Sequence, residues 1–136
     1  MLYYLLYLGI ESFPFKGKDF DELLIQARER NELLGITGKL IYCEGTFLQL
    51  LEGDETNVKA IYASIEKDSR LIATKLISDG TAENRYFEEW SMAFEKVPLK
   101  TLTEFEGCTH ENVGTYLRDA PVVQLLKILA NSNLRD

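Results

Sequence analysis

The chain has 136 residues, with 15 lysine and arginine against 22 aspartate and glutamate, and a net charge of -7. This length is typical of one domain, and a hydrophobic content of 46% predicts a packed core rather than disorder. The acidic balance excludes nucleic acid as an expected partner, because binding a phosphate backbone needs clustered cations. The apolar run over 1–10 is too short to cross a membrane and lacks the basic start of a secretory signal, so we expect a cytoplasmic protein without membrane contact.

Residues that bind metals or act as nucleophiles are scarce. Cys43 and Cys108 are too few for a disulfide framework, and their spacing matches no zinc motif. His110 is the only histidine, so a catalytic triad or a histidine-rich metal site would depend on one residue in a polar stretch. We therefore expect no metal site and no triad chemistry.

Hydrophobic periodicity and turn residues predict the first elements. A strand over 2–10 is apolar on both alternating faces, which is typical of a strand covered on both sides. A helix follows with Asp19 as its expected N-cap, and Gly35 ends it. Two strands over 36–43 and 46–53 then form a tight hairpin.

The second half of the sheet follows the same alternation. Glu52 and Gly53 are expected to be turn and cap residues, and Asp54 is expected to cap a second helix. Extended segments follow over 71–79 and 86–97. The order predicts an α+β fold, a ferredoxin-like βαββαβ sandwich with an additional strand and two helices side by side in the same direction. This shape names no function by itself.

The rest of the chain is predicted to be helical. Apolar residues at helical spacing indicate helices over 111–118 and 120–134. Because the first strand is apolar on both faces, we expect these C-terminal helices on the opposite sheet face from the first two. The predicted organisation is a domain over 1–97 and a helical extension over 98–136 packed on the sheet.

Gln49 is a neutral amide within an apolar strand. Strand alternation places it on the same sheet face as Tyr7, and burying an amide without partners costs about 1 to 3 kcal/mol. We expect the Tyr7 hydroxyl to reach the Gln49 amide, with Asn31 above the same face. Taken alone, each has a structural interpretation, Tyr7 as a core tyrosine and Gln49 as an amide that ties two strands together.

Three separated motifs resemble the BLUF family of flavin-based blue-light sensors. They are Asn31 followed by Gly35-Ile36-Thr37-Gly38, then Phe47-Leu48-Gln49-Leu50-Leu51-Glu52-Gly53, then Trp90-Ser91-Met92. The resemblance covers 1–97, and the remainder resembles the helical extension of short, single-domain BLUF proteins. It implies the sandwich predicted above, with the isoalloxazine ring of FAD between the two helices and against the sheet.

The resemblance also implies residue roles. By position, Tyr7 is the electron donor, Gln49 the switching amide, Met92 its neighbour, and Trp90 a residue that exchanges places with Met92, while Asn31 grips the pyrimidine edge of the flavin. The implied cofactor-binding residues are Tyr7, Leu23, Ala27, Arg30, Asn31, Phe47, Gln49, Ile65, Asp68, Arg70 and Met92.

Three positions depart from the family pattern. Leu8 replaces a small polar or basic residue, Ser64 a basic residue and Leu71 a histidine. These departures affect the expected phosphate and ribityl contacts more than the ring contacts. Arg30, expected at the same end of the paired helices as Arg70, is the candidate to meet the diphosphate instead.

The function that the resemblance implies is blue-light sensing and not enzyme catalysis. Light-driven electron and proton transfer from Tyr7 through Gln49 would rearrange the flavin hydrogen bonds and change protein association, in a homo-oligomer or with an unidentified downstream partner. An alternative is a flavin-free interaction module on the same sandwich. A small hydrolase ranks last, since no glycine-rich anion-binding loop follows the first strand.

Overall fold

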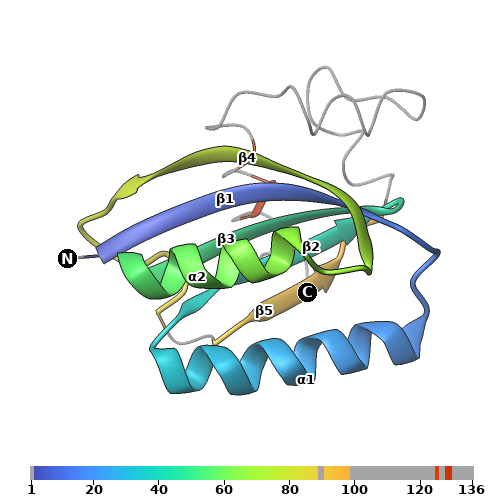
Figure 1. Cartoon of the computed structure of the whole chain (residues 1–136), viewed down its shortest axis with the longest axis horizontal. Coiled ribbons are helices and arrows are strands. Elements are labelled where there is room, and N and C mark those ends of the chain that lie inside the picture. Colours follow the sequence, from blue (N-terminus) through green and yellow to red (C-terminus); the bar gives the residue numbers. More distant parts are fainter. Residues whose placement is uncertain (1, 89–90, 99–124, 126–127, 130–136) are drawn as a thin grey trace.

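The computed structural model describes residues 2–88, 91–98, 125 and 128–129. Its elements are β1 (Leu2–Glu11), α1 (Gly17–Leu34), β2 (Thr37–Cys43), β3 (Thr46–Asp54), α2 (Glu55–Glu66), β4 (Leu71–Thr81) and β5 (Ala93–Lys96). The five-stranded sheet has the order β4-β1-β3-β2-β5, in which only the β2–β5 pair is parallel. Both helices cover one sheet face (Figure 1), so the predicted ferredoxin-like α+β fold is confirmed.

The two helices run in opposite directions (Figure 1), and the expectation of a common direction is wrong. The strands that precede them, β1 and β3, are antiparallel neighbours, and each helix returns along the sheet against its own strand. Arg30, near the end of α1, and Arg70, after α2, therefore lie at opposite ends of the helix pair rather than at the same end.

The helix N-termini are capped by acidic residues in two different ways. Asp54 is the predicted N-cap of α2, and its carboxylate accepts the backbone N–H of Thr56 at 3.1 Å. Asp19 is not the N-cap of α1, because the helix already begins at Gly17. Its carboxylate instead accepts the backbone N–H of Lys16 at 2.9 Å, which satisfies a donor that the helix leaves open.

Two glycines fix the chain between α1 and β3. Gly35 has φ 67°, the left-handed conformation that ends a helix at low cost only for glycine. Gly38 lies against β3 so closely that a Cβ there would be 1.9 Å from the carbonyl oxygen of Leu50. Both positions of this motif are therefore required by the backbone rather than by a ligand.

Glu52 differs most from its expected place in a turn. It lies within β3, is 1% exposed, and its carboxylate accepts the hydroxyl of Thr37 and the backbone N–H of Phe87, each at 3.1 Å, as well as that of Tyr86. The chain bends around this carboxylate instead of continuing as a strand. The predicted strand over 86–97 is consequently reduced to β5.

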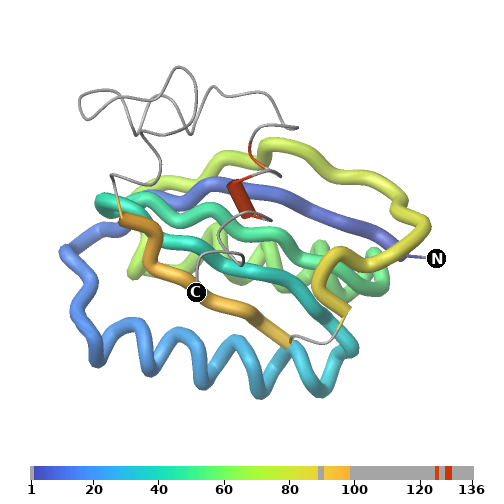
Figure 2. Tube along the Cα trace, turned by 180° about the vertical axis from the view of Figure 1, so that it is seen from behind, coloured from blue at the N-terminus to red at the C-terminus, as the bar shows by residue number. Residues whose placement is uncertain are grey.

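The middle of β1 is buried on both sheet faces, as predicted. Tyr3, Leu5 and Tyr7 face the helices, while Leu6 and Leu8 belong to a second core on the other face. That second core includes three described residues of the C-terminal extension, which Figure 2 shows across the sheet: Leu125, Ile128 and Leu129. These three residues lie on the predicted sheet face, while the helix predicted over 111–118 and most of the one predicted over 120–134 lie outside the described residues, so the domain boundary stays a prediction.

Candidate functional site: a cavity between the helices and the sheet

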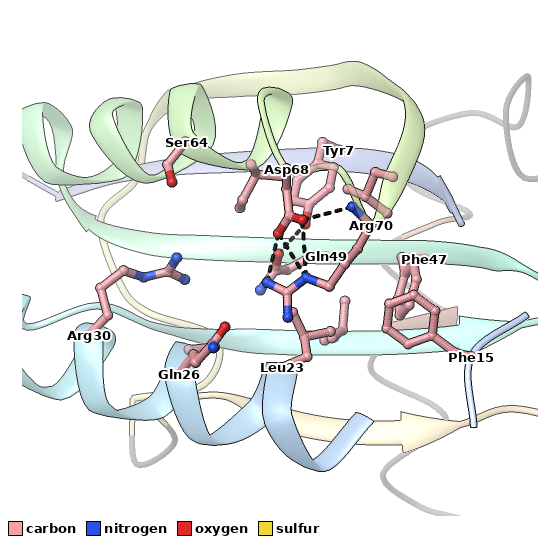
Figure 3. Close-up of a pocket in the computed structure, with 14 residues that line it drawn as sticks. Tyr7, Phe15, Leu23, Gln26, Arg30, Phe47, Gln49, Ser64, Asp68 and Arg70 are labelled. Carbon is pink, nitrogen blue, oxygen red and sulfur yellow. Dashed lines mark hydrogen bonds and ion pairs between the residues drawn. The ribbon is translucent and has the colours of Figure 1, made fainter. Parts of the chain in front are cut away.

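A cavity of about 180 Å³ lies between α1, α2 and the helix-facing side of the sheet (Figure 3). Most of the residues predicted to bind the cofactor line it: Tyr7, Leu23, Ala27, Arg30, Phe47, Gln49, Ile65, Asp68 and Arg70. No cofactor contact was predicted for the other lining residues, of which Ser64 and Leu71 are two of the positions that depart from the family pattern: Phe15, Gln26, Leu40, Ser64 and Leu71. Strand register could have identified Leu40, because it is the β2 partner of Gln49.

A chain of neutral hydrogen bonds forms the floor of the cavity. Tyr7 and Gln49 are direct partners across β1 and β3, and the Tyr7 hydroxyl donates to Gln49 Oε1, as predicted. The other end of the amide, Nε2, donates to the sulfur of Met92 at 3.2 Å. Gln49 is 4% exposed, so both ends of a buried amide are satisfied inside the protein without any charged group.

Two predicted site residues do not line the cavity. Asn31 is completely buried, and its Nδ2 donates to the backbone carbonyl of Ser91 at 2.7 Å while its Oδ1 accepts from Arg30 at 3.2 Å. Met92 is not among the lining residues, but its sulfur accepts a hydrogen bond from Gln49, which is. Their contact with the cofactor stays a prediction, and Trp90 lies outside the described residues.

Figure 3 shows Asp68 and Arg70 paired at one side of the cavity. Arg70 Nη2 lies 2.7 Å from Asp68 Oδ2, and hydrogen bonding by Arg70 holds the pKa of the Asp68 carboxyl below its ordinary value. Arg30 lines the same cavity, where burial lowers the pKa of its guanidinium. Two guanidinium groups against one carboxylate make this cavity positive in an acidic chain, which favours an anionic ligand group.

Buried tyrosines make stability sensitive to alkaline pH. Burial raises the pKa of Tyr7 above its ordinary value of 10, and burial followed by a hydrogen bond to Asp79 raises that of Tyr3 to about 12. The unfolded chain loses these protons from pH 10 upward while the folded chain keeps them. This contribution to stability is therefore fully present below pH 10 and is lost as pH rises through the folded pKa values.

We expect the free energy of unfolding to fall between about pH 9 and about pH 11, with about 1.4 kcal/mol of that fall due to Tyr7. Urea unfolding at the two pH values, in wild type and in Tyr7→Phe, measures it. The variant should show the smaller fall, because phenylalanine has no proton to lose. Equal falls in the two proteins would show that Tyr7 ionises as freely in the folded chain as in the unfolded one.

The residues around the cavity fit a flavin. A neutral aromatic ring system needs apolar walls and a few placed donors and acceptors, and Leu23, Ala27 and Ile65 supply such walls above the Tyr7–Gln49 floor. An apolar cavity of about 150 Å³ already binds benzene, so this one admits part of a ring system. A guanidinium group, at either end of the helix pair, suits the diphosphate of a dinucleotide. Fold and cavity together define a domain that holds an aromatic, anionic cofactor.

Comparison with known proteins identifies the family. The BLUF model, described as sensors of blue light using FAD, matches residues 2–93, and the chain belongs to this family. Its function is blue-light sensing and its cofactor is FAD, as the motifs predicted. BLUF domains are photoreceptor domains and not enzymes themselves.

Relatives share this domain at low identity. A photoactivated adenylate cyclase subunit beta of Euglena longa is 30% identical over 89 residues, which are 65% of this chain and 10% of that protein. The structure titled BlsA photo-activated state has a TM-score of 0.80 at 26% identity and covers 100% of this chain and 96% of that one. The dark-state structure of the BLUF protein BlrB has a TM-score of 0.77 at 24% identity, over 97% and 96% of the two chains. The chain spans about a tenth of the length of the curated relatives that it matches.

The part of the chain that the structure describes contains neither a candidate membrane-spanning helix nor a candidate metal-binding cluster. None of its helices is long and apolar enough to cross a membrane. Its histidine, cysteine, aspartate and glutamate side chains form no group of three that could hold a metal ion.

Proposed function

We propose that this BLUF domain detects light through Tyr7 and Gln49 and transmits the change through Met92 and β5. Bound FAD would supply a ring that absorbs blue light and can accept an electron from a nearby donor. Tyr7 is the donor, because it is the oxidisable side chain on the cavity floor. Its raised pKa keeps the phenol protonated until the electron leaves, and its hydroxyl already donates to Gln49 Oε1, which can take the proton.

The observation that supports Gln49 as the switch is its position between two different neighbours. Its Oε1 accepts from Tyr7, and its Nε2 donates to the Met92 sulfur at 3.2 Å. An amide has an acceptor oxygen at one end and a donor nitrogen at the other. Rotation of the side chain therefore exchanges the oxygen and the nitrogen that face Tyr7, Met92 and the cavity. A proton that arrives at Oε1 removes the acceptor that holds the resting orientation. Return of the electron and of a proton to the Tyr7 oxygen would then restore every charge, so that only the orientation of the Gln49 amide and its hydrogen bonds differ from the resting state.

Replacing Gln49 with leucine should leave FAD bound and eliminate the light-induced red shift of its absorption. Leucine fills a similar volume but can neither accept from Tyr7 nor donate to Met92. Absorption spectra before and after blue light measure the shift. Gln26→Leu is the matched control, because Gln26 lines the same cavity from α1 without being part of the Tyr7 contact. A full shift in Gln49→Leu would exclude Gln49 as the switch.

The proposed route out of the cavity crosses the sheet. Met92 directly precedes β5, which pairs with β2. Lys39 of β2 is completely buried, and its Nζ lies 3.4 Å from Glu95 Oε1 of β5 and 3.1 Å from the backbone carbonyl of Leu129. Lys39 thus joins the strand next to Met92 to the C-terminal extension. A displacement of β5 would be transmitted to that extension through the ammonium group of Lys39.

The proposed output is a change in protein association, within a homo-oligomer or with a downstream protein. The Euglena relatives support a downstream effector, since their names join photoactivation to adenylate cyclase in much longer proteins. Light scattering in the dark and under continuous blue light tests the homo-oligomer, with a light-dependent change in mass expected. An unchanged mass would contradict the homo-oligomer and leave an effector protein as the output. No described contact favours the flavin-free interaction module.

A further inference from the structure

We propose that Arg28 is a positioning residue that holds Met92 where its sulfur can accept from Gln49. The inference rests on the proposed switch role of Gln49. Arg28 lies on α1 with an exposed side chain and does not line the cavity. Its Nε nevertheless donates to the backbone carbonyl of Met92 at 3.0 Å. This contact joins α1 directly to Met92, the neighbour of the proposed switch residue Gln49.

A second contact also joins α1 to the residues that precede β5. Asn31 donates to the carbonyl of Ser91 at 2.7 Å, next to the carbonyl that Arg28 binds. Arg28 and Asn31 are three residues apart on a helix, so their side chains leave the same face. Two consecutive carbonyls are thus fixed to one helix. These bonds hold the backbone of Met92, which is 1% exposed. Its side chain extends from this fixed backbone to Gln49.

The strengths of the contacts show why this support is needed. A thioether sulfur is a weak acceptor, and methionine has three rotatable bonds, so the Gln49–Met92 contact alone holds the sulfur poorly. A guanidinium that donates to a carbonyl makes a stronger, charge-assisted hydrogen bond. Arg28 therefore stabilises the arrangement in which Met92 faces Gln49. It follows that losing Arg28 disfavours the resting state relative to any state in which Met92 has moved.

The test compares Arg28→Met with Lys18→Met in FAD-loaded protein. Both substitutions remove an exposed cation from α1 and leave an unbranched side chain, but only Arg28 contacts Met92. We expect dark recovery after a blue pulse to slow about tenfold in Arg28→Met, the effect of about 1.4 kcal/mol, and to keep its wild-type rate in Lys18→Met. Arg28→Lys, which keeps a cationic donor, should restore part of the rate.

A second readout does not depend on the photocycle. The chain has two methionines, Met1 and Met92, and each test variant adds a third, so methyl labelling of methionine gives an NMR spectrum in which the Met92 signal of each protein is assigned with a Met92→Leu version of that same protein. In the dark, the Met92 signal should be displaced in Arg28→Met and unchanged in Lys18→Met. An unmoved signal, or a recovery as fast as wild type or faster, overturns the role of Arg28. A wild type without a light response would instead contradict the proposed switch, while the dark NMR comparison would still test Arg28.

Discussion

Replacing Tyr7 with phenylalanine should leave FAD bound and reduce the yield of the red-shifted state by at least about a hundredfold. Phenylalanine keeps the ring that packs against Tyr62 at 5.3 Å between centroids, so the cavity wall remains. It removes the oxidisable phenol and the hydroxyl that donates to Gln49, and a positioned proton transfer contributes about 10²- to 10⁴-fold to a reaction. The amplitude of the shift after a calibrated blue pulse, normalised to flavin content, measures the loss.

Tyr62→Phe is the matched control for this prediction. Tyr62 lies on α2, is 9% exposed, and its ring is tilted by 51° against the ring of Tyr7. The same atom is removed next to the same cavity, but Tyr62 does not line the cavity floor and the Gln49 contact stays intact. We expect a normal shift. A normal shift in Tyr7→Phe together with a lost shift in Tyr62→Phe would assign the donor to Tyr62.

The parts of the fold that follow from local patterns could be predicted from the sequence. Alternation placed Tyr7 and Gln49 on the same face of neighbouring strands, and the double-sided apolar pattern of β1 indicated a second core under the C-terminal extension. Glu52 shows where this reasoning fails. Its backbone partner Tyr86 follows it by 34 residues, and nothing in a strand pattern indicates that a carboxylate will be satisfied by main-chain donors from so far along the chain.

The site was predictable to a similar extent. The apolar walls and the Tyr7–Gln49 pair follow from motifs and register, because side-chain type and alternation are visible in a sequence. The backbone carbonyls of Ser91 and Met92, which accept from Asn31 and Arg28, are not visible, since every residue has one. Sequence motifs therefore assign Asn31 to the cofactor alone and indicate no role for Arg28.

Removing the carboxylate of Glu95 should destabilise the protein by about 3 kcal/mol, whereas Lys39→Met should cost much less. The side chain of Lys39 is 1% exposed and that of Glu95 17%. Glu95→Leu removes the carboxylate that lies 3.4 Å from the buried ammonium, while Lys39→Met removes the buried charge and leaves a carboxylate that reaches water. Urea unfolding of both variants and of the double variant measures the difference, and the double variant should resemble Lys39→Met.

The exposed pair of Lys59 and Glu55 is the control for this stability difference. Its side chains are 56% and 52% exposed, so Glu55→Gln should leave the unfolding midpoint unchanged. Equal destabilisation by Glu95→Leu and Lys39→Met would contradict this explanation. It would show that Glu95 does not offset the cost of burying the Lys39 charge.

The same Lys39→Met variant separates light detection from transmission. Its substitution lies on the sheet face opposite the cavity, so the red shift and its recovery should match wild type. The ammonium of Lys39, which contacts both Glu95 of β5 and the carbonyl of Leu129, is lost, so any light-dependent change in hydrogen exchange beyond residue 98 should disappear. A retained change there would show that β5 reaches the extension without Lys39. A lost red shift would show instead that the buried charge supports the cavity itself.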